Sequence, residues 1–366
     1  MVEKKEAKIN PLNDVRQRID SIDGEIEKLI SERAQCALDV ATIKRTAGEF
    51  NFYRPEREAQ VLQKMKERNS GVLSDDEMAR LFREIMSACL ALEQSLKIAY
   101  LGPEGTYTQS AALKHFGHSV TTNPVSAIDE IFREVESGAA DFGVVPVENS
   151  TEGMVNQSMD LFIHSPLIIC GEVQLRIHHH FLSRVSDIKS IKRIYSHQQS
   201  FAQCREWLNS NMVGVSRITV NSNAEAARCA SEENDAAAIA GETAGEIYRL
   251  QSIAKNIEDD PQNTTRFLVV GKDKTAASGK DKTSLMLSSQ NQPGALYSLL
   301  EPFRRFGVSM TRVESRPARQ GMWEYVFFVD IDGHVDDKNI QKALAEVKNA
   351  STMFKVLGSY PRAVIA

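Results

Sequence analysis

The feature that most constrains this chain is a long apolar stripe near its start. Apolar side chains recur three or four positions apart from Val15 to Ile43, and no proline interrupts them. This spacing places them along one face of an α-helix roughly 45 Å long. A single helix cannot bury such a face by itself, so the sequence predicts a partner helix or a partner subunit.

Two further helices are expected before residue 97. Residues 48–55 break the helical pattern, and a second helix is expected over about 56–68. Ser74 followed by Glu77 is a capping box, which predicts a third helix that runs to about Leu96. Three helices with one very long member suggest an intertwined dimer.

Composition excludes several classes of function. The chain has 366 residues and a net charge of −5, so no basic footprint for nucleic acid is indicated. No apolar run approaches the ~18 residues that span a membrane, and the first ten residues lack the apolar core of a secretory signal. The five cysteines are widely spaced, which favours free thiols in a reducing cytoplasm.

From Lys97 onward, strand-like and helical patterns alternate, which indicates an α/β domain. Residues 97–271 are long enough for two lobes with a cleft between them. The apolar runs expected to form strands are Phe142–Val147, Leu167–Cys170, Ile191–Tyr195, Ala236–Ala240 and Phe267–Val270.

The last part of the chain predicts a small separate domain. Residues 272–282 are polar and turn-rich and are expected to be a linker, which places domain boundaries at 1–96, 97–271 and 283–366. The elements expected after the linker follow the ferredoxin-like order βαββαβ. They are Ser284–Ser288, Gly294–Phe306, Val308–Glu314, Tyr325–Ile331, Asp337–Val347 and Phe354–Leu357.

Basic side chains on the long helix form a candidate anion site. Arg33 and Lys44 are nearly in phase at about 100° per residue, whereas Arg16 faces elsewhere. A small dianion could therefore meet Arg33 and Lys44 of one chain and Arg16 of another. On spacing alone, solvated charges on a helix face explain the same pattern.

Arg16, Glu32–Arg33, Lys44, Arg57–Glu58 and the run FREIMSACLALEQ resemble the all-helical class of chorismate mutase over about residues 10–95. The resemblance implies a dimer with two shared sites that rearranges chorismate to prephenate without a cofactor. It also implies the site roles. Arg16 and Arg33 hold carboxylates, Lys44 supports the ether oxygen, Arg57 lines the pocket, and Glu58 takes the substrate hydroxyl.

Two positions depart from that pattern. Arg54 stands where many relatives carry Asp, and Glu93 stands where some carry Gln. Gln can donate a hydrogen bond to the ether oxygen, whereas an ionised Glu cannot. Glu93 would have to be protonated to act catalytically, so mutase activity is expected to rise as the pH falls below 7.

Four motifs lie in the α/β segment: GPEGTYT, PVENSTEG, SHQQSFAQC and NTTRF. Each places polar residues at a strand end or helix start, where α/β folds bind ligands. Taken singly, they are also ordinary turns and helix caps. His178–His180 are adjacent on an expected strand and point to alternate faces, so no shared metal is expected.

In this order and spacing the four motifs resemble prephenate dehydratase over about residues 97–271. The resemblance implies two lobes like those of periplasmic binding proteins, and conversion of prephenate to phenylpyruvate, CO2 and water without cofactor or metal. It implies Thr265 as the catalytic hydroxyl and Arg266 as the carboxylate anchor. The residues that it implies shape the pocket are Asn149, Ser150, Thr151 and Gln203.

Pro293–Leu296 opens an expected helix and Glu314–Pro317 ends an expected strand. These two motifs resemble the ACT regulatory domain of prephenate dehydratases, over about residues 283–360. Alone, they are consistent with a helix start and a strand-end turn. The resemblance implies that they bind L-phenylalanine between two subunits. Tyr297 stands where that family usually carries a branched apolar residue, directly after Gly294–Leu296. The implied effector residues are Gly294, Ala295, Leu296, Glu314, Ser315, Arg316 and Pro317.

Together these resemblances predict a bifunctional chorismate mutase–prephenate dehydratase, inhibited by phenylalanine and built as a homodimer or a dimer of dimers. One alternative is a monofunctional dehydratase whose helical segment is a dimerisation arm. Another is a non-catalytic amino-acid sensor. A prephenate dehydrogenase is not expected, because the sequence contains no dinucleotide-binding loop.

Overall fold

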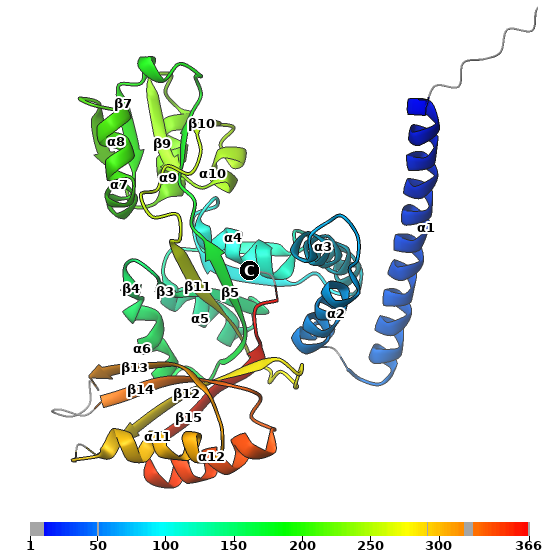
Figure 1. Cartoon of the computed structure of the whole chain (residues 1–366), viewed down its shortest axis with the longest axis vertical. Helices are drawn as coiled ribbons and strands as arrows, with labels where there is room; N and C mark the ends of the chain where they lie inside the picture. Colours follow the sequence, from blue (N-terminus) through cyan, green and yellow to red (C-terminus); the bar gives the residue numbers. More distant parts are fainter. Residues whose placement is uncertain (1–10, 50, 291, 318–324, 365–366) are drawn as a thin grey trace, which may run out of the picture.

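A computed structural model describes residues 11–49, 51–290, 292–317 and 325–364. Within these residues, no helix combines the length and apolar character needed to cross a membrane. The chain forms a helical part, a two-lobed α/β part and a C-terminal α/β part (Figure 1). This is the fold class that the sequence predicts.

The helical part contains α1 (Pro11–Thr46), α2 (Pro55–Arg68) and α3 (Asp75–Glu93). The side chain of Ser74 caps α3 by accepting a hydrogen bond from the Glu77 amide. The helix ends before Leu96, earlier than expected, because Gln94 is already extended and leads into the first strand.

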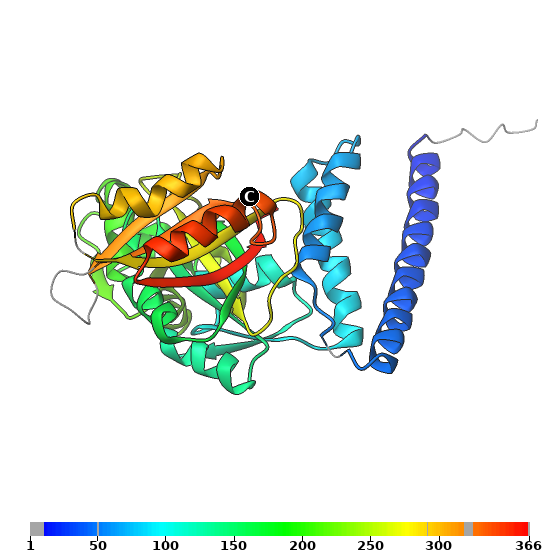
Figure 2. The same cartoon turned by 90° about the horizontal axis from the view of Figure 1, so that it is seen from below.

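Most of the long helix α1 stands apart from the rest of the chain, and only its C-terminal end packs against α3 (Figures 1 and 2). Its C-terminal end leads into α2 and contacts α3, where the Arg45 guanidinium donates to the carbonyl oxygen of Glu93 at 2.8 Å. Ile19, Ile22, Ile26 and Leu29 on its apolar stripe remain between 45% and 62% exposed. The predicted stripe is therefore present and uncovered within one chain.

The first lobe is built on a sheet in the order β2-β1-β3-β11-β5, with the short strand β4 (Gly153–Met154) paired to β3. Its helices are α4 (Tyr107–Phe116), α5 (Ile128–Ser137) and α6 (Asn156–His164). The strands are β1 (Lys97–Leu101), β2 (Thr121–Val125), β3 (Phe142–Asn149), β5 (Ile168–Arg176) and β11 (Thr264–Gly271).

The second lobe has the strand order β10-β6-β9-β7-β8. The chain enters this lobe after β5 and returns through β11, so two crossovers join the lobes. Its strands are β6 (His180–Ser183), β7 (Arg193–Ser196), β8 (Ser216–Thr219), β9 (Ala236–Ala240) and β10 (Gln251–Ala254). Its helices are η1 (Ile188–Ser190), α7 (Gln198–Gln203), α8 (Arg205–Asn211), α9 (Asn223–Ser231) and α10 (Glu242–Ile247).

The C-terminal part has the predicted βαββαβ order, and its antiparallel sheet runs β13-β14-β12-β15. Apolar side chains of α11 and α12 cover one face of this sheet. Its elements are β12 (Asp281–Ser289), α11 (Ala295–Arg305), β13 (Met310–Pro317), β14 (Tyr325–Asp332), α12 (Lys338–Ala350) and β15 (Met353–Pro361).

The other face of the C-terminal sheet packs against the first lobe (Figure 1). Met286, Phe328 and Leu357 belong to the same apolar core as Ile169 of β5. The approach is close, because a Cβ atom at Gly358 would clash with the backbone of Ile169. The C-terminal part and the first lobe therefore share one continuous core.

Candidate active site

A polar cluster lies where the first lobe faces the second. Asn149, at the end of β3, is paired in register with Thr265, at the start of β11. The Nδ2 atom of Asn149 donates to Thr265 Oγ1 and to Asn263 Oδ1, both at 2.8 Å. Asn263 Nδ2 in turn donates to Gln203 Oε1, at the end of α7 in the second lobe, at 3.2 Å.

The direction of these hydrogen bonds is fixed by the backbone. The amides of Thr151 and Glu152 both donate to Asn149 Oδ1 at 3.0 Å, so the other terminal atom of Asn149 must be its amide nitrogen. The oxygen of Thr265 therefore accepts a hydrogen bond, and its own proton stays available. Among the described residues, no acceptor takes that proton.

The loop after β3 is held against β11. Ser150 accepts from the Thr264 amide at 3.0 Å and donates its own amide to the Thr264 carbonyl at 2.9 Å. The Thr151 hydroxyl donates to Asn263 Oδ1 at 3.4 Å. The structure thus gathers these expected residues around Thr265. The set is Asn149, Ser150, Thr151 and Gln203.

Asn263 also belongs to this cluster, although the sequence pattern alone does not predict a role for it. It is buried, and it links the first lobe to the second through its two terminal atoms. Its place in the sequence could have indicated a role, because Asn263 is the first residue of the NTTRF motif. An amide directly before a strand is usually a turn residue, which is why the pattern alone gave it no role.

The GPEGTYT motif lies on a different part of the inter-lobe space. Thr106 caps α4, and Gly102 and Thr106 line a cavity of about 930 Å³ together with Ser222 and Tyr248 of the second lobe. Tyr107 points the other way, toward His179, with its hydroxyl 2.8 Å from Nδ1. The motif therefore forms the lobe-facing end of α4.

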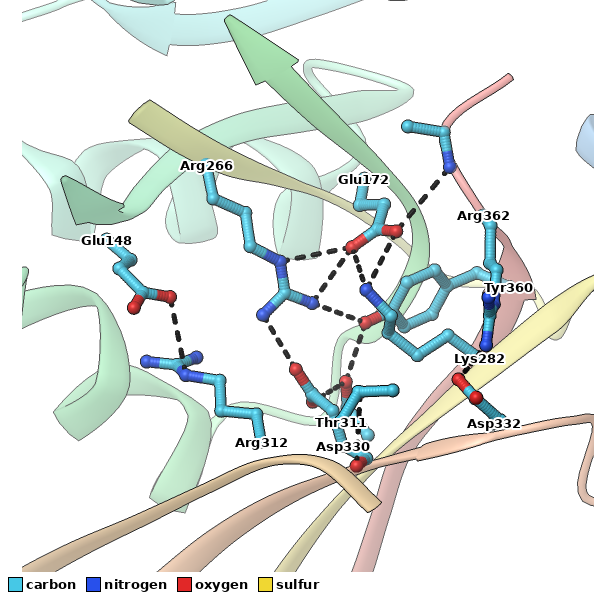
Figure 3. Close-up of polar contacts among 12 residues, drawn as sticks. Glu148, Glu172, Arg266, Lys282, Thr311, Arg312, Asp330, Asp332, Tyr360 and Arg362 are labelled. Atoms are coloured by element: carbon cyan, nitrogen blue, oxygen red, sulfur yellow. Dashed lines mark hydrogen bonds and ion pairs between the residues drawn. The ribbon is translucent and has the colours of Figure 1, made fainter. Parts of the chain in front are cut away.

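Arg266 is not brought to the Thr265 cluster, although it was expected to anchor a substrate carboxylate there. Neighbouring residues of a strand point to opposite faces, so Arg266 on β11 faces the C-terminal sheet (Figure 3). Its guanidinium donates to Glu172 at 3.0 Å and to Asp330 of β14 at 2.6 Å. The structure thus assigns Arg266 to a junction between domains.

The junction is buried and densely paired (Figure 3). Lys282 of β12 donates to Glu172 at 2.7 Å, and Tyr360 of β15 accepts from Arg266 at 3.0 Å. Burial acts to lower the pKa of Arg266, but Tyr360, Asp330 and Glu172 outweigh it and raise that pKa. The arginine is therefore charged at every relevant pH and needs these partners.

A second set of contacts joins β13 to the first lobe. Arg312 pairs with Glu148 at 3.3 Å, and Glu148 lies opposite Arg266 in the β3–β11 register (Figure 3). Arg316 pairs with Asp160 of α6 at 2.8 Å and donates to the carbonyl oxygen of Asn156 at 2.7 Å. Arg316 belongs to the expected effector motif Glu314–Pro317, which therefore touches the α/β lobe directly.

The other expected effector motif lies at the start of α11. Gly294 is the N-cap residue, with a φ of 81° that favours glycine. Gly294, Ala295 and Leu296 line a hollow of about 250 Å³ that also includes the exposed Tyr297. The Glu314–Pro317 motif does not line this hollow, so one chain does not join the two motifs into one pocket.

Part of the expected mutase site is assembled within the chain. Arg33, Lys44 and Arg45 on α1 are close enough to Glu93 to affect its titration. Burial raises the pKa of Glu93, and the three basic groups oppose that rise. Lys44 Nζ also lies 3.4 Å from the carbonyl oxygen of Phe52.

The remaining expected mutase residues lie apart from this group. Arg16 is exposed on α1 and lies about 42 Å along the helix from Lys44. Arg57 is exposed. Glu58 pairs with Arg83 at 3.1 Å in a small cavity against the α/β lobe, where burial raises the pKa of Glu58. Within one chain the helical site is thus incomplete.

Comparison with known families matches all three parts. The chorismate mutase type II model matches residues 15–94, and the prephenate dehydratase model matches residues 98–275. The ACT domain model matches residues 283–349. The three matches follow the order of the helical, two-lobed and C-terminal parts.

Two relatives match this chain over nearly its whole length. The chain is 55% identical over 359 residues to the bifunctional chorismate mutase/prephenate dehydratase of Stutzerimonas stutzeri, covering 97% of this chain and 98% of that protein. It is 54% identical over 359 residues to the same-named protein of Pseudomonas aeruginosa, with the same coverage. A solved prephenate dehydratase of Arthrobacter aurescens in complex with L-Phe is 31% identical, with a TM-score of 0.68 over 74% of this chain and 91% of that one. The chain therefore belongs to the bifunctional chorismate mutase/prephenate dehydratase family.

Proposed function

We propose that this chain rearranges chorismate to prephenate in its helical part and converts prephenate to phenylpyruvate between its two α/β lobes. The family and the matching of all three parts support both activities. The observation that carries the dehydratase assignment is the orientation of Thr265. Asn149 donates to its oxygen at 2.8 Å, which leaves the hydroxyl proton for a substrate.

The dehydratase reaction needs little beyond orientation and one hydrogen-bond donor. The bond between the ring and its carboxylate breaks, and CO2 leaves. The electron pair enters the ring, and the ring hydroxyl departs as hydroxide, which takes up one proton from the solvent to form water. Thr265 donates a hydrogen bond to that departing hydroxyl, while Asn149, Ser150, Thr151 and Gln203 shape the pocket around it. A neutral threonine is a weak acid, so its contribution is stabilisation of the leaving oxygen rather than full proton transfer.

Substitution of Thr265 tests this assignment. Thr265→Ala is expected to lower kcat for prephenate conversion by at least about 100-fold, because the donor to the departing hydroxyl is lost. Thr265→Ser keeps the hydroxyl and is the matched control. Both variants should retain mutase activity, since the helical site shares no residue with the Thr265 cluster. An alanine variant with near-normal kcat would contradict the role, and loss of both activities would contradict the division into domains.

The mutase site is proposed to form between two copies of the chain. Arg33, Lys44 and Glu93 of one copy provide part of it, and Arg16 of the other copy supplies a carboxylate partner. The exposed stripe on α1 supports this arrangement, because a second α1 would cover it. The rearrangement is unimolecular, so a compact substrate held by these cations is sufficient. Arg57 and Glu58 would join the site only with a local rearrangement.

We further propose inhibition by L-phenylalanine through the ACT part. The structure of the A. aurescens relative with L-Phe supports this effector. The residues proposed to bind it are Gly294, Ala295, Leu296 and Glu314–Pro317, contributed by two subunits. The contacts of Asp330 with Arg266 and of Arg312 with Glu148 offer a route from the ACT sheet to β3 and β11.

The assembly is proposed to be a homodimer or a dimer of dimers. The monofunctional alternative would keep α1 only as a dimerisation arm, and the presence of Arg33, Lys44 and Glu93 in one group argues against it. A non-catalytic sensor would not need the oriented Thr265 hydroxyl. A cytoplasmic location is consistent with the five free thiols.

A further inference from the structure

The polar cluster around Thr265 continues behind Gln203 to a buried histidine. His179 lies between β5 and β6, on one of the two crossovers that join the lobes, and is 1% exposed. Its Nε2 atom is 2.8 Å from Gln203 Oε1. Its Nδ1 atom is 2.8 Å from the hydroxyl of Tyr107, at the start of α4. These contacts of one crossover residue thus reach both lobes.

The backbone fixes the proton positions along this chain of contacts. Two backbone amides orient Asn149, and Asn149 orients Asn263 by donating to its Oδ1. Asn263 Nδ2 then faces Gln203 Oε1, so the oxygen of Gln203 also faces His179. An oxygen cannot donate, and His179 must therefore carry its proton on Nε2.

The surroundings of His179 keep its ring neutral. Burial lowers the pKa of His179, which favours the neutral ring with a single proton. With that proton on Nε2, Nδ1 can accept from the Tyr107 hydroxyl, whose single proton faces two acceptors, Nδ1 and the carbonyl oxygen of His178, each at 2.8 Å. The backbone amide of His179 donates to Glu258 at 2.9 Å, which holds the residue in place.

We propose that His179 is a positioning residue for the dehydratase reaction, a role that rests on the function proposed above. It does not contact the substrate. Its Nε2 proton fixes the orientation of the Gln203 amide, whose oxygen accepts from Asn263. Asn263 in turn accepts from the same Asn149 amide that donates to Thr265. With the proton on Nδ1 instead, two lone pairs would face each other between His179 and Gln203. The amide of Gln203 would then flip, and its Nε2 amino group would face the Nδ2 amino group of Asn263, so that two donors oppose each other.

The test compares two substitutions at His179. His179→Gln places an amide nitrogen near the position of Nε2 and keeps the donor to Gln203. His179→Met fills a similar volume without a donor. We expect His179→Met to lower kcat for prephenate by about 10- to 100-fold with little change in KM, because the reacting groups lose their alignment. His179→Gln should restore most of that loss.

His115 provides the matched control for removing a buried histidine. Its Nε2 lies 3.2 Å from the Tyr53 hydroxyl, away from the Thr265 cluster, so His115→Met should leave kcat for prephenate near that of the unmodified chain. Tyr107→Phe removes the partner of Nδ1 and should lower kcat less than His179→Met does. Mutase activity, measured in the same samples, should stay unchanged in all four variants.

The outcomes separate this inference from the proposed function. If the unmodified chain does not convert prephenate, the proposed function is wrong. If it does, and His179→Met and His179→Gln lose kcat equally while their melting temperatures match the unmodified chain, the donor role of His179 is wrong. A change confined to KM would also overturn it, since a positioning residue acts on the reacting geometry.

Discussion

At the scale of single residues, the chemistry depends on which atom of each polar group carries a proton. Thr265 can donate because Asn149 already donates to it, and Asn149 is fixed by two backbone amides. Glu93 presents the same question in the helical site. It can donate to a substrate ether oxygen only when it is protonated, and burial raises its pKa.

The pH dependence of the mutase reaction follows from Glu93. Because its pKa is raised, its protonated form persists to higher pH than that of an ordinary glutamate, and it becomes more populated as the pH falls. Mutase kcat is therefore expected to rise below pH 7. Glu93→Gln donates at every pH and should flatten the profile. Initial rates of chorismate consumption across pH 5 to 8 check this, and a flat profile in the unmodified chain would refute the role of Glu93.

At the scale of elements, the strand β11 makes different contacts on its two faces. Thr265 faces the space between the lobes, and Arg266 faces the ACT sheet. The adjacent strand β3 repeats the division, with Asn149 on one face and Glu148 on the other. A shift of the ACT sheet would therefore act on residues that are covalent neighbours of the Thr265 cluster.

A substitution in the junction between the first lobe and the ACT sheet is expected to change both the stability of the chain and its inhibition by L-phenylalanine. Asp330→Asn removes the charge that faces Arg266 at 2.6 Å, where both side chains are largely buried. We expect a loss of about 2–4 kcal/mol in the free energy of unfolding and a weaker inhibition by L-phenylalanine. Urea unfolding and dose–response curves with prephenate measure the two effects.

The matched control is the pair of Arg193 and Asp235, which has a similar distance of 2.7 Å but more exposed side chains. Asp235→Asn should cost less than about 1 kcal/mol, because surface ion pairs are well screened. Equal costs at Asp330 and Asp235 would show that the junction is not a tight buried network.

Most elements could be predicted from the sequence because their apolar residues are periodic. Ala236–Ala240 is fully buried, and its predicted bounds match β9. The strands β2, β8 and β10 were not singled out, because they lie at sheet edges and are rich in polar residues. Edge strands face solvent and lack the apolar signal on which such predictions depend.

The candidate site was predicted only in part, for a related reason. Motifs identify polar residues that share a segment, but the face of each residue depends on strand register and on the neighbouring domain. Arg266 follows Thr265 directly, and only the packed ACT sheet shows that it points away. Asn263 and His179 gain their roles from contacts between distant segments, which no local pattern records.

At the scale of the whole molecule, one copy of the chain does not bring the proposed mutase residues together. The stripe on α1 is exposed, and Arg16 is too far from Lys44 to share a site within one copy. A second copy would resolve both features at once, by covering the stripe and by bringing its own Arg16. Assembly and mutase activity are therefore expected to depend on the same surface.

Disruption of this stripe tests that dependence. Ile26→Lys places a charge in the middle of the stripe, so we expect the assembly to fall from dimer to monomer, or from tetramer to dimer. Mutase kcat/KM should fall about 10- to 100-fold, because the contact from Arg16 is lost. Light scattering and chorismate assays measure both effects. Gly24→Lys adds the same charge on the opposite face, where a Cβ meets no neighbouring atom, and should change neither. An unchanged mass in Ile26→Lys would contradict a shared mutase site.

The most direct test of the whole account is phenylpyruvate formation from chorismate by the purified chain, with and without L-phenylalanine and with no cofactor or metal added. We predict that phenylpyruvate forms and that L-phenylalanine suppresses it, which requires the helical, two-lobed and ACT parts to act in one molecule. If only added prephenate is converted, the helical part is not a mutase and the bifunctional assignment is contradicted.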